Sequence, residues 1–470
     1  MITKFIKRIL RRDPMVKQSH VNHGGAPKHI PKKSHRIDPH LLSKNAVKVT
    51  QTLQQAGYEA FIVGGAVRDL ALGIAPKDFD VATNATPDQV QRLFRKARLI
   101  GRRFQIVHVT FFGKGHPEII EVSTFRALLE NAGDHVAESG RILRDNVWGS
   151  QGEDAARRDF TVNAMYYDPS TETVLDYHGG MADMQKKTLR MIGDPAKRYR
   201  EDPVRMLRAI RFAAKTGFTL DADTRAPISK LGPLLEDVPP ARLFDEILKL
   251  LMSGHSWAAI QGLQEAGLHH GVLPLLDRIL DDKESAEGHQ FVKLALANTD
   301  QRIQSGKSVS AGFLFATLLW PDLLQNWQAN LAKGMANIPA LQDAMDNTIA
   351  AQSSGMTIQR RFESDMREIW SMQPRFEKRV GRYPYRLIES PRFRAGYDFM
   401  LLRCATGEQN PALGQWWTDF IAADPSTQEA LLASVKNEAG SALKTAAKRR
   451  RRRKPKANIA AATPPETTAG

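Results

Sequence analysis

Two aspartates separated by one residue, Asp78 and Asp80, are the first candidates for chemistry in this sequence. Residues two apart on a β-strand point to the same face, so a strand here would bring both carboxylates together. Neighbouring carboxylates repel each other unless a cation lies between them. Magnesium, or manganese in its place, suits the pair because it takes oxygen ligands and binds substrate phosphates at the same time. The pattern predicts a metal site for phosphoryl chemistry.

A third carboxylate would complete such a site, and two residues compete for the role. Glu121 is a charged residue in the otherwise apolar stretch 119–122. Asp159 follows Arg157 and Arg158, with which it would otherwise form only a weak surface ion pair. Spacing along the chain does not choose between Glu121 and Asp159.

A pair of glycines, Gly64 and Gly65, follows the short apolar run 60–63. Glycine lets a phosphate approach the backbone closely, and the start of a helix offers free N–H groups to an anion. Arg68 lies about one turn into that helix and could pair with a phosphate. These residues predict a triphosphate-binding turn ahead of the aspartates.

A second group of polar candidates begins the helical half of the chain. Pro203 suits the first turn of a helix, which makes Asp202 a candidate N-cap. Arg205 and Arg208 are three residues apart and share one helix face. Two arginines and a carboxylate can bind a base edge or a triphosphate. The alternative is the salt-bridged outer face of an amphipathic helix.

The elements that position these groups follow from the periodicity of the sequence. Helix and strand signals alternate in the first part of the chain: a strand at 60–63, a helix at 66–72 ended by Gly73, a helix opened by Thr86-Pro87, strands at 106–112 and 119–124, and a hairpin at 166–175. From about Asp202 to residue 440 helical spacing dominates. This order predicts a mixed α/β domain followed by an all-helical second half.

The composition excludes several classes of protein. The chain has 470 residues, enough for two to four domains, and its single cysteine, Cys404, excludes an intrachain disulfide. No apolar run reaches the roughly 18 residues of a membrane span. We find no signal peptide and expect a cytoplasmic protein.

The net charge of +16 is concentrated at the two ends of the chain. Residues 1–36 carry +9 and residues 444–470 carry +8, which leaves the rest at about −1. We expect both arms to be disordered and to hold polyanions without reading sequence. The tail contains the arginine run Arg449, Arg450, Arg451, Arg452 and Arg453, the candidate RNA-binding residues.

A further candidate is the stretch 360–394, where ten Arg and Lys residues mix with aromatic ones. Cations and aromatics together suit single-stranded nucleic acid. Aromatics at helical spacing are also typical of a protein core, and this alternative stays open.

Four motifs in order resemble the class II nucleotidyltransferases of the polymerase-β superfamily. They are Gly64-Gly65-Ala-Val-Arg68-Asp69, Asp78-Phe-Asp80, Arg157-Arg158-Asp159-Phe-Thr161 and Glu201-Asp202-Pro-Val-Arg205-Met-Leu-Arg208. This family comprises bacterial poly(A) polymerases and tRNA CCA-adding enzymes. The resemblance covers about residues 40–260.

The resemblance implies a polymerase-β-like head with a mixed sheet, followed by all-α neck, body and C-terminal domains. We expect the head at 37–184, the neck at 185–260, a helical RNA-binding region at 261–443, and the arms at 1–36 and 444–470. The resemblance also implies that Asp78 and Asp80 bind the metal and that Asp159 is the favoured third acid. It further assigns nucleotide binding to Gly64, Gly65, Arg68 and Arg158, and base selection to Asp202, Arg205 and Arg208.

Two features favour the poly(A) polymerase branch of this family. The segment 99–109 and the basic tail 448–456 are both typical of that branch. We therefore expect transfer of AMP from ATP to RNA 3′ ends, in company with RNA-decay proteins. The alternatives are CCA addition to tRNA and a catalytically inactive RNA-binding protein on the same fold.

Overall fold

The computed structural model describes residues 25–101, 105–113, 117–128, 147–268, 286–353 and 358–436. Its chain divides into two compact units, Met1–Asp277 and Arg278–Gly470. The arginine run Arg449–Arg453 and most of the N-terminal arm lie outside the described residues. Across the described residues, no helix is both long enough and apolar enough to cross a membrane.

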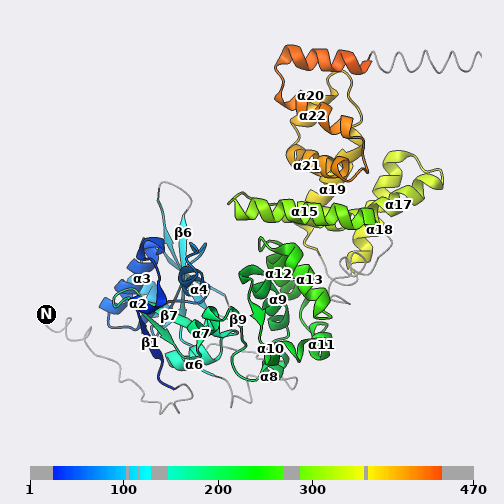
Figure 1. Ribbon diagram of the computed structural model, residues 1–470. Coiled ribbons are helices and arrows are strands. Elements are labelled where there is room, and N and C mark those ends of the chain that lie inside the picture. Colours follow the sequence, from blue (N-terminus) through cyan, green and yellow to red (C-terminus); the bar gives the residue numbers. More distant parts are fainter. Residues whose placement is uncertain are drawn as a thin grey trace, which may run out of the picture. The chain divides into compact units, whose positions relative to one another are not determined.

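The first unit is built on a mixed eight-stranded sheet in the order β1-β8-β7-β2-β3-β6-β5-β4 (Figure 1). Its strands are β1 Lys28–Pro31, β2 Ala60–Val63, β3 Asp80–Thr83, β4 Ala97–Ile100, β5 Ile106–Phe111, β6 Glu118–Thr124, β7 Met165–Asp168 and β8 Thr173–Asp176. Only β3 and β6 run parallel among these neighbours. The expected strands and the 166–175 hairpin are confirmed within about a residue.

The N-terminal arm is shorter than the sequence suggested. Strand β1 pairs with β8, and the short helix α2 (Lys32–His35) follows it. Ile30 and Ile37 are buried, and the His35 ring binds the carbonyl of Glu172 at 2.9 Å. The expectation of a disordered arm up to residue 36 is therefore wrong for residues 28–36. The lysines of β1 and α2 are exposed, while Ile30, His35 and Ile37 pack on the head.

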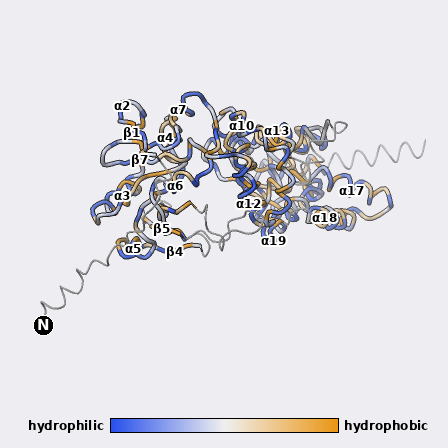
Figure 2. Tube along the Cα trace, turned by 90° about the horizontal axis from the view of Figure 1, so that it is seen from below, coloured by the Kyte–Doolittle hydropathy of each residue, from blue (hydrophilic) through white to orange (hydrophobic). Residues whose placement is uncertain are grey.

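One face of the sheet is covered by helices α3 (Lys44–Gln55) and α5 (Pro87–Leu93), which contact strands β2 to β6 and each other. Ser43 caps α3, and Thr86 forms a capping box with Gln89 at the start of α5. Val81, Val122 and Val107 point to this face and are almost fully buried. In Figure 2 hydrophilic and hydrophobic stretches alternate along these elements, as one-sided burial requires.

The opposite face is only partly covered. Its inner end is packed by α6 (Gln151–Ala156), where Ala155 joins a cluster with Val63, Ala82, Phe125, Tyr166 and Leu175. Toward β5 and β4 the same face holds exposed or half-buried side chains. We call this exposed part of the surface, over β3 to β4, the open face.

The neck belongs to the first unit. After α7 Gly180–Gln185 at the end of the head, it contains the helices α8 Pro195–Glu201, α9 Val204–Thr216, α10 Ala222–Arg225, α11 Ile228–Leu231, α12 Pro240–Leu251 and α13 Ser256–Glu265, with a two-stranded sheet of β9 Thr188–Leu189 and β10 Thr219–Leu220. Helix α13 packs against α9. The neck boundary expected at residue 260 falls within α13, and the compact unit that contains the neck extends to Asp277.

The second unit is helical, as expected. Its described helices are α15 Ala286–Gln304, α16 Ala311–Leu318, α17 Trp320–Ala332, α18 Asn337–Ser353, α19 Arg360–Met372, α20 Tyr383–Ile388, α21 Phe393–Ala405 and α22 Pro411–Ala422. Phe376, Phe393, Trp416 and Trp417 form a buried cluster. Trp370 is fully buried and donates to the Ala316 carbonyl. The aromatics of 360–394 are therefore largely core, which favours the packing alternative over base stacking.

Candidate active site

A row of polar side chains crosses the open face, starting at the first residue of β3. We call its members Asp80, Glu121 and His108 the acidic row. Asp80 is in register with Glu121 of the parallel strand β6, and Glu121 is in register with His108 of β5. The His108 Nε2 and Glu121 Oε1 atoms are 3.4 Å apart. Asp78 lies two residues before Asp80, outside the strand, so the strand expected for both aspartates begins only at the second one. The β3–β6 register thus gives Asp80 a second acidic neighbour, Glu121.

The charge on Asp80 is poorly compensated. Although the side chain reaches solvent, the surrounding protein atoms and the negative charges of Glu121 and Asp78 raise its pKa to about 6. The Arg158 cation acts in the opposite direction but does not prevail. A carboxylate in this condition favours a bound cation.

These acids fit a divalent ion of the magnesium type. No three His, Cys, Asp or Glu side chains cluster as a preformed metal cage within the described parts of the chain. Magnesium needs no such cage, because it is held by one or two carboxylates and takes its other ligands from water and phosphate. Asp78 and Asp80 supply that pair, and Glu121 lies next to it on the sheet.

Gly64 links these acids to the turn before helix α4 (Gly65–Ala71). Its backbone has φ +74° and ψ −134°, a conformation that favours glycine. A Cβ at this position would lie 3.5 Å from Nη1 of Arg158 and 4.0 Å from Oδ2 of Asp80. A cation, a carboxylate and an open backbone therefore meet at Gly64, as a bound phosphate with its metal ion requires.

Arg158 is fixed by residues that the sequence did not single out. Its Nη2 atom donates to Asp154 at 2.9 Å, and its Nε atom donates to the Tyr166 hydroxyl at 3.2 Å. The Tyr166 hydroxyl in turn donates to Asp154 at 2.6 Å. Nη1, the atom nearest Gly64, forms no hydrogen bond with a described residue. Asp154 and Tyr166 thus hold the guanidinium while one of its nitrogens faces the glycine turn.

Arg68 occupies a different environment from the one expected. Its guanidinium is buried and donates to Asp69 at 2.6 Å and to Asn163 at 2.6 Å. Lys215 of α9 also reaches Asp69, at 3.1 Å. Arg68 therefore ties α4 to the segment after Asp159, and it points to protein acceptors and not to solvent.

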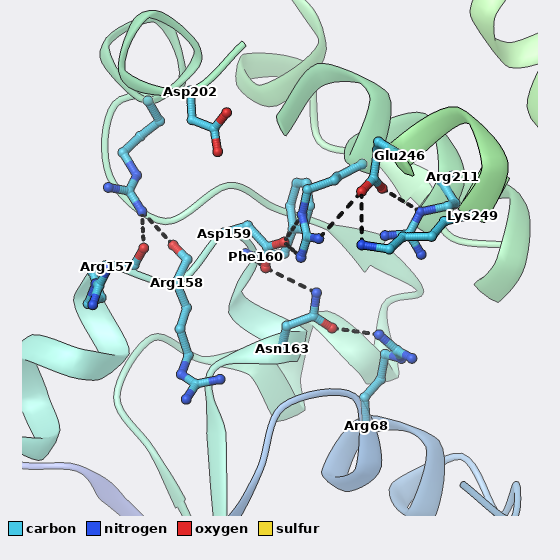
Figure 3. A network of polar contacts seen from close by, with 12 residues as sticks. Arg68, Arg157, Arg158, Asp159, Phe160, Asn163, Asp202, Arg211, Glu246 and Lys249 are labelled. Atoms are coloured by element: carbon cyan, nitrogen blue, oxygen red, sulfur yellow. Dashed lines mark hydrogen bonds and ion pairs between the residues drawn. The ribbon is translucent and has the colours of Figure 1, made fainter. Parts of the chain in front are cut away.

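Asp159 does not belong to the acidic row, and its carboxylate has a separate set of hydrogen-bond partners. Its carboxylate accepts hydrogen bonds from the Phe160 backbone N–H at 2.8 Å and from Asn163 at 3.1 Å (Figure 3). Nε of Arg208 donates to it at 2.9 Å. Burial would raise the pKa of Asp159, but Arg208 and these hydrogen bonds lower it to about 2. Asp159 is thus a fully paired carboxylate that joins the head to α9.

The same contacts continue into α12. Glu246 is buried and binds Nε of Arg211 at 2.7 Å, with Arg208 at 4.0 Å and Lys249 at 3.9 Å (Figure 3). We call the set Asp159, Asn163, Arg208, Arg211 and Glu246 the Asp159 network. It fixes helix α9 against the head.

Asp202 and Arg205 are held near each other but by separate partners. Asp202 is not the expected N-cap, because no side chain caps α9. One Asp202 oxygen, Oδ2, accepts from Arg242 at 2.5 Å, while the buried Oδ1 has no partner among described residues. Arg205 donates to the Arg198 carbonyl at 3.1 Å and to Glu201 at 3.2 Å.

A cleft of about 270 Å³ lies in the neck, and it is lined by the residues on either side of Asp202 but not by Asp202 itself. Glu201, Pro203, Val238 and Arg242 are among the residues that line it. A buried acceptor without a partner next to a cleft is a candidate contact for the edge of a base.

Three family models match the chain. They are the poly A polymerase head domain over residues 60–190, the "Probable RNA and SrmB- binding site of polymerase A" over residues 217–280, and the polymerase A arginine-rich C-terminus over residues 333–456. The last match includes the arginine run of the tail.

Whole-chain similarity separates the two branches of the family. The chain is 42% identical to the poly(A) polymerase I of Salmonella typhi, a match that covers 93% of this chain and 95% of that protein. It is 39% identical to the CCA-adding enzyme of Bacillus velezensis, but over 53% of this chain and 60% of that enzyme. The likeness to the polymerase continues through the second unit.

The fold has a counterpart among solved structures. The CCA-adding enzyme of Bacillus stearothermophilus in complex with CTP matches with a TM-score of 0.53 and 27% identity, covering 84% of this chain and 92% of that one. The expected mixed-sheet head with helical domains is thereby confirmed. Taken with the acidic row and the glycine turn, these matches show that the chain belongs to the bacterial poly(A) polymerase I family, nucleotidyltransferases related to the CCA-adding enzymes.

Proposed function

We propose that this chain extends RNA 3′ ends without a template, by transferring AMP from ATP to the terminal hydroxyl. The hydroxyl oxygen attacks the α-phosphorus, the bond from that phosphorus to the bridging oxygen breaks, and pyrophosphate leaves. The hydroxyl proton passes to a base at the site or to water. The observation that carries the proposal is the meeting of Asp80, Glu121, Gly64 and Arg158 at one point in a chain of this family.

The acidic residues of the row have distinct roles in this reaction. Asp78 and Asp80 hold the magnesium or manganese ion, and Glu121 is the third acid because it is in register with Asp80. When bound, the ion lowers the pKa of the attacking hydroxyl and neutralises charge on the phosphates. Asp159 has its oxygens committed to Arg208 and Asn163, so we assign it a positioning role.

The triphosphate binds at the glycine turn. Gly64 and Gly65 leave room for the phosphates, and Arg158 neutralises their charge through the nitrogen that faces Gly64. Arg68 stabilises the turn by its hydrogen bonds to Asp69 and Asn163.

The adenine base is selected in the neck. Asp202 offers its unpartnered oxygen as an acceptor for an exocyclic amino group, and Arg205 is the neighbouring donor. Arg208 supports them by fixing α9 through Asp159. The basic arms, including Arg449 to Arg453, hold RNA near the site by charge, so affinity should fall steeply with salt.

The test is nucleotide incorporation on an oligo(A) primer, with each of the four nucleoside triphosphates supplied separately. Long extension with ATP alone is expected. Extension that stops after C, C and A on a tRNA would instead identify a CCA-adding enzyme.

Catalysis by this site is tested with the double variant Asp78→Asn/Asp80→Asn. It should lose incorporation, while Asp88→Asn, on the covered side of the sheet, should retain it. If the double variant incorporated AMP as fast as the unmodified protein, the site would be misassigned. If the unmodified protein bound RNA but incorporated nothing, the inactive RNA-binding alternative would hold.

A further inference from the structure

The open face extends beyond the acidic row to the edge of the sheet. Arg98 of the edge strand β4 is in register with His108, which continues the row from Asp80 and Glu121 across four strands. Neighbouring strands lie about 4.8 Å apart, so Arg98 is about 14 Å from Asp80 along the row. The row therefore forms one continuous surface that begins at the reacting groups.

Three large apolar side chains on this surface are exposed to solvent. Phe112 is 67% exposed, Ile119 is 45% exposed and Ile100 is 42% exposed. Ile119 and Ile100 share the face of Glu121 and Arg98, because each lies two residues from one of them on the same strand. Sheet faces with several exposed apolar side chains commonly mark binding surfaces.

Phe112 is paired with a cation. The Lys96 ammonium lies 4.1 Å from the centroid of the Phe112 ring. The backbone N–H of Thr110 donates to the Lys96 carbonyl at 3.1 Å, which continues the β4–β5 pairing and keeps the two residues adjacent. Neither Lys96 nor Arg98 forms an ion pair with a described residue. The surface thus presents a ring in contact with one cation, Lys96, which comes immediately before β4, and a second cation, Arg98, on β4 itself.

We propose that this surface, formed by Lys96, Arg98, Phe112 and Ile119, binds the RNA nucleotides immediately upstream of the 3′ end. A base stacks on Phe112 and Ile119, while Lys96 and Arg98 pair with backbone phosphates. The inference rests on the proposed function, since it is the acceptor RNA that must reach the acidic row. It assigns to that RNA a subsite in the head, apart from the basic arms.

Two observations select single-stranded RNA as the occupant. The cations complement a phosphate backbone, and they are interleaved with a ring that can stack any base. The surface is also continuous with the row that contains Asp80, so a strand whose 3′ hydroxyl lies at Asp80 passes over it. A protein partner seated here would block that path.

The first experiment measures steady-state kinetics with a ten-nucleotide oligo(A) primer. Phe112→Ala should raise the KM for the primer about five- to a hundredfold, the range of a lost stacked base, and leave the KM for ATP unchanged. Phe112→Trp should retain a low primer KM, because it keeps a stacking ring. Because Phe112 is exposed, neither variant should change the thermal unfolding temperature.

The second experiment removes the cations. Lys96→Gln/Arg98→Gln should weaken oligo(A) binding and reduce the slope of log affinity against log salt by about 1.4, which is 0.7 for each lost phosphate contact. The matched control is Lys44→Gln/Lys48→Gln on α3, on the covered side of the sheet, which should leave affinity and slope unchanged.

The outcomes separate this inference from the proposed function. An unchanged primer KM in Phe112→Ala, in a protein that still polyadenylates, would overturn the inference alone. If Phe112→Ala lowered the unfolding temperature without changing the affinity for oligo(A), the Phe112 ring would be packed against other parts of the protein. That result would also overturn the inference. If the unmodified protein failed to add AMP while Phe112→Ala still weakened oligo(A) binding, the proposed function would fail and the RNA surface would stand.

Discussion

Asp80 and Asp159 are both aspartates of the first unit, and both belong to motifs of the family, but their surroundings differ. Asp80 lies beside Glu121 and Asp78, and its pKa is raised to about 6. Asp159 is bound by Arg208, Asn163 and a backbone N–H, and its pKa is lowered to about 2. The acid proposed to bind a cation is left without enough positive charge, whereas the acid that holds elements together is fully paired.

The two arginines Arg158 and Arg68 also differ in how far their guanidinium groups are occupied by protein partners. Arg158 leaves one nitrogen facing Gly64, at 3.5 Å from a Cβ placed there. Arg68 gives its guanidinium to Asp69 and Asn163 and is buried. A phosphate can reach the first arginine directly, while the second acts through the segments that it joins.

The largest effect expected from this comparison is on catalysis, in the variant Glu121→Gln. Removing a charged group at a site of phosphoryl transfer should lower kcat about 10²- to 10³-fold. Stability should stay the same or rise slightly, because a repulsion with Asp80 is lost. Rates at saturating ATP and primer, together with thermal unfolding, measure both quantities. A Glu121→Gln protein with normal kcat would return the role of third acid to Asp159.

The next effect is on stability, in the variant Asp159→Asn. Neutralising one partner of a largely buried pair leaves Arg208 with only the longer contact to Glu246, at 4.0 Å, and should cost about 2–3 kcal/mol of unfolding free energy. Asp159 has a folded pKa of about 2, below the unfolded value of about 3.9. Its contribution is therefore complete above about pH 4 and is lost as the pH falls toward 2.

Urea unfolding of both proteins between pH 7 and pH 2 measures this linkage. The difference in stability between the unmodified protein and Asp159→Asn should shrink as the pH falls through that window. A difference that stayed constant down to pH 2 would mean that the charge of Asp159 is not what stabilises the fold.

The sequence predicted the parts of the site that depend on neighbours in the chain. The strand 60–63, the glycine turn and the capped helix at Thr86 all follow from local chemistry and are present. The choice between Glu121 and Asp159 depends on the register of β3 with β6, whose paired residues are 41 positions apart in the sequence, and no local pattern fixes it. The sheet pairing, and not the motif, brings Glu121 beside Asp80.

Some sequence signals were also outweighed by tertiary contacts. Asp202 has the residue type and position of an N-cap, yet Arg242, 40 residues away, binds its carboxylate. Asp154 and Tyr166 gave no signal beyond an acid and a strand aromatic, although they hold Arg158. An ion pair between residues far apart in the sequence has no regular spacing along the chain by which it could be recognised.

A smaller effect is expected on nucleotide choice, in the variant Arg242→Gln. Arg242 fixes one oxygen of Asp202, and the other oxygen is buried without a partner among the described residues. Without this ion pair Asp202 can turn, so the preference for ATP over CTP should fall about five- to twentyfold. The ratio of kcat/KM for the two nucleotides measures it, with Arg225→Gln on α10 as the control. An unchanged ratio would show that Arg242 takes no part in base selection.

The smallest effect is expected from Tyr166→Phe, which tests how firmly the Arg158 cation must be held. The Tyr166 hydroxyl donates to Asp154 at 2.6 Å and accepts from Arg158 at 3.2 Å. Removing it leaves the Arg158–Asp154 ion pair at 2.9 Å, so the loss should be about 1 kcal/mol of unfolding free energy. Because Arg158 faces the glycine turn proposed to bind the triphosphate, the KM for ATP should rise about two- to fivefold, with the primer KM unchanged.

The balance of these two readouts decides what the hydroxyl does. A loss of stability with an unchanged KM for ATP would mean that Asp154 alone orients Arg158 and that Tyr166 only fills the core beneath it. A rise in the ATP KM with little loss of stability would mean that the hydroxyl sets the direction of Nη1 toward Gly64. The second result would extend the comparison with Asp159, since the same kind of buried hydrogen bond would then serve substrate binding at Arg158 and the attachment of α9 to the head at Asp159.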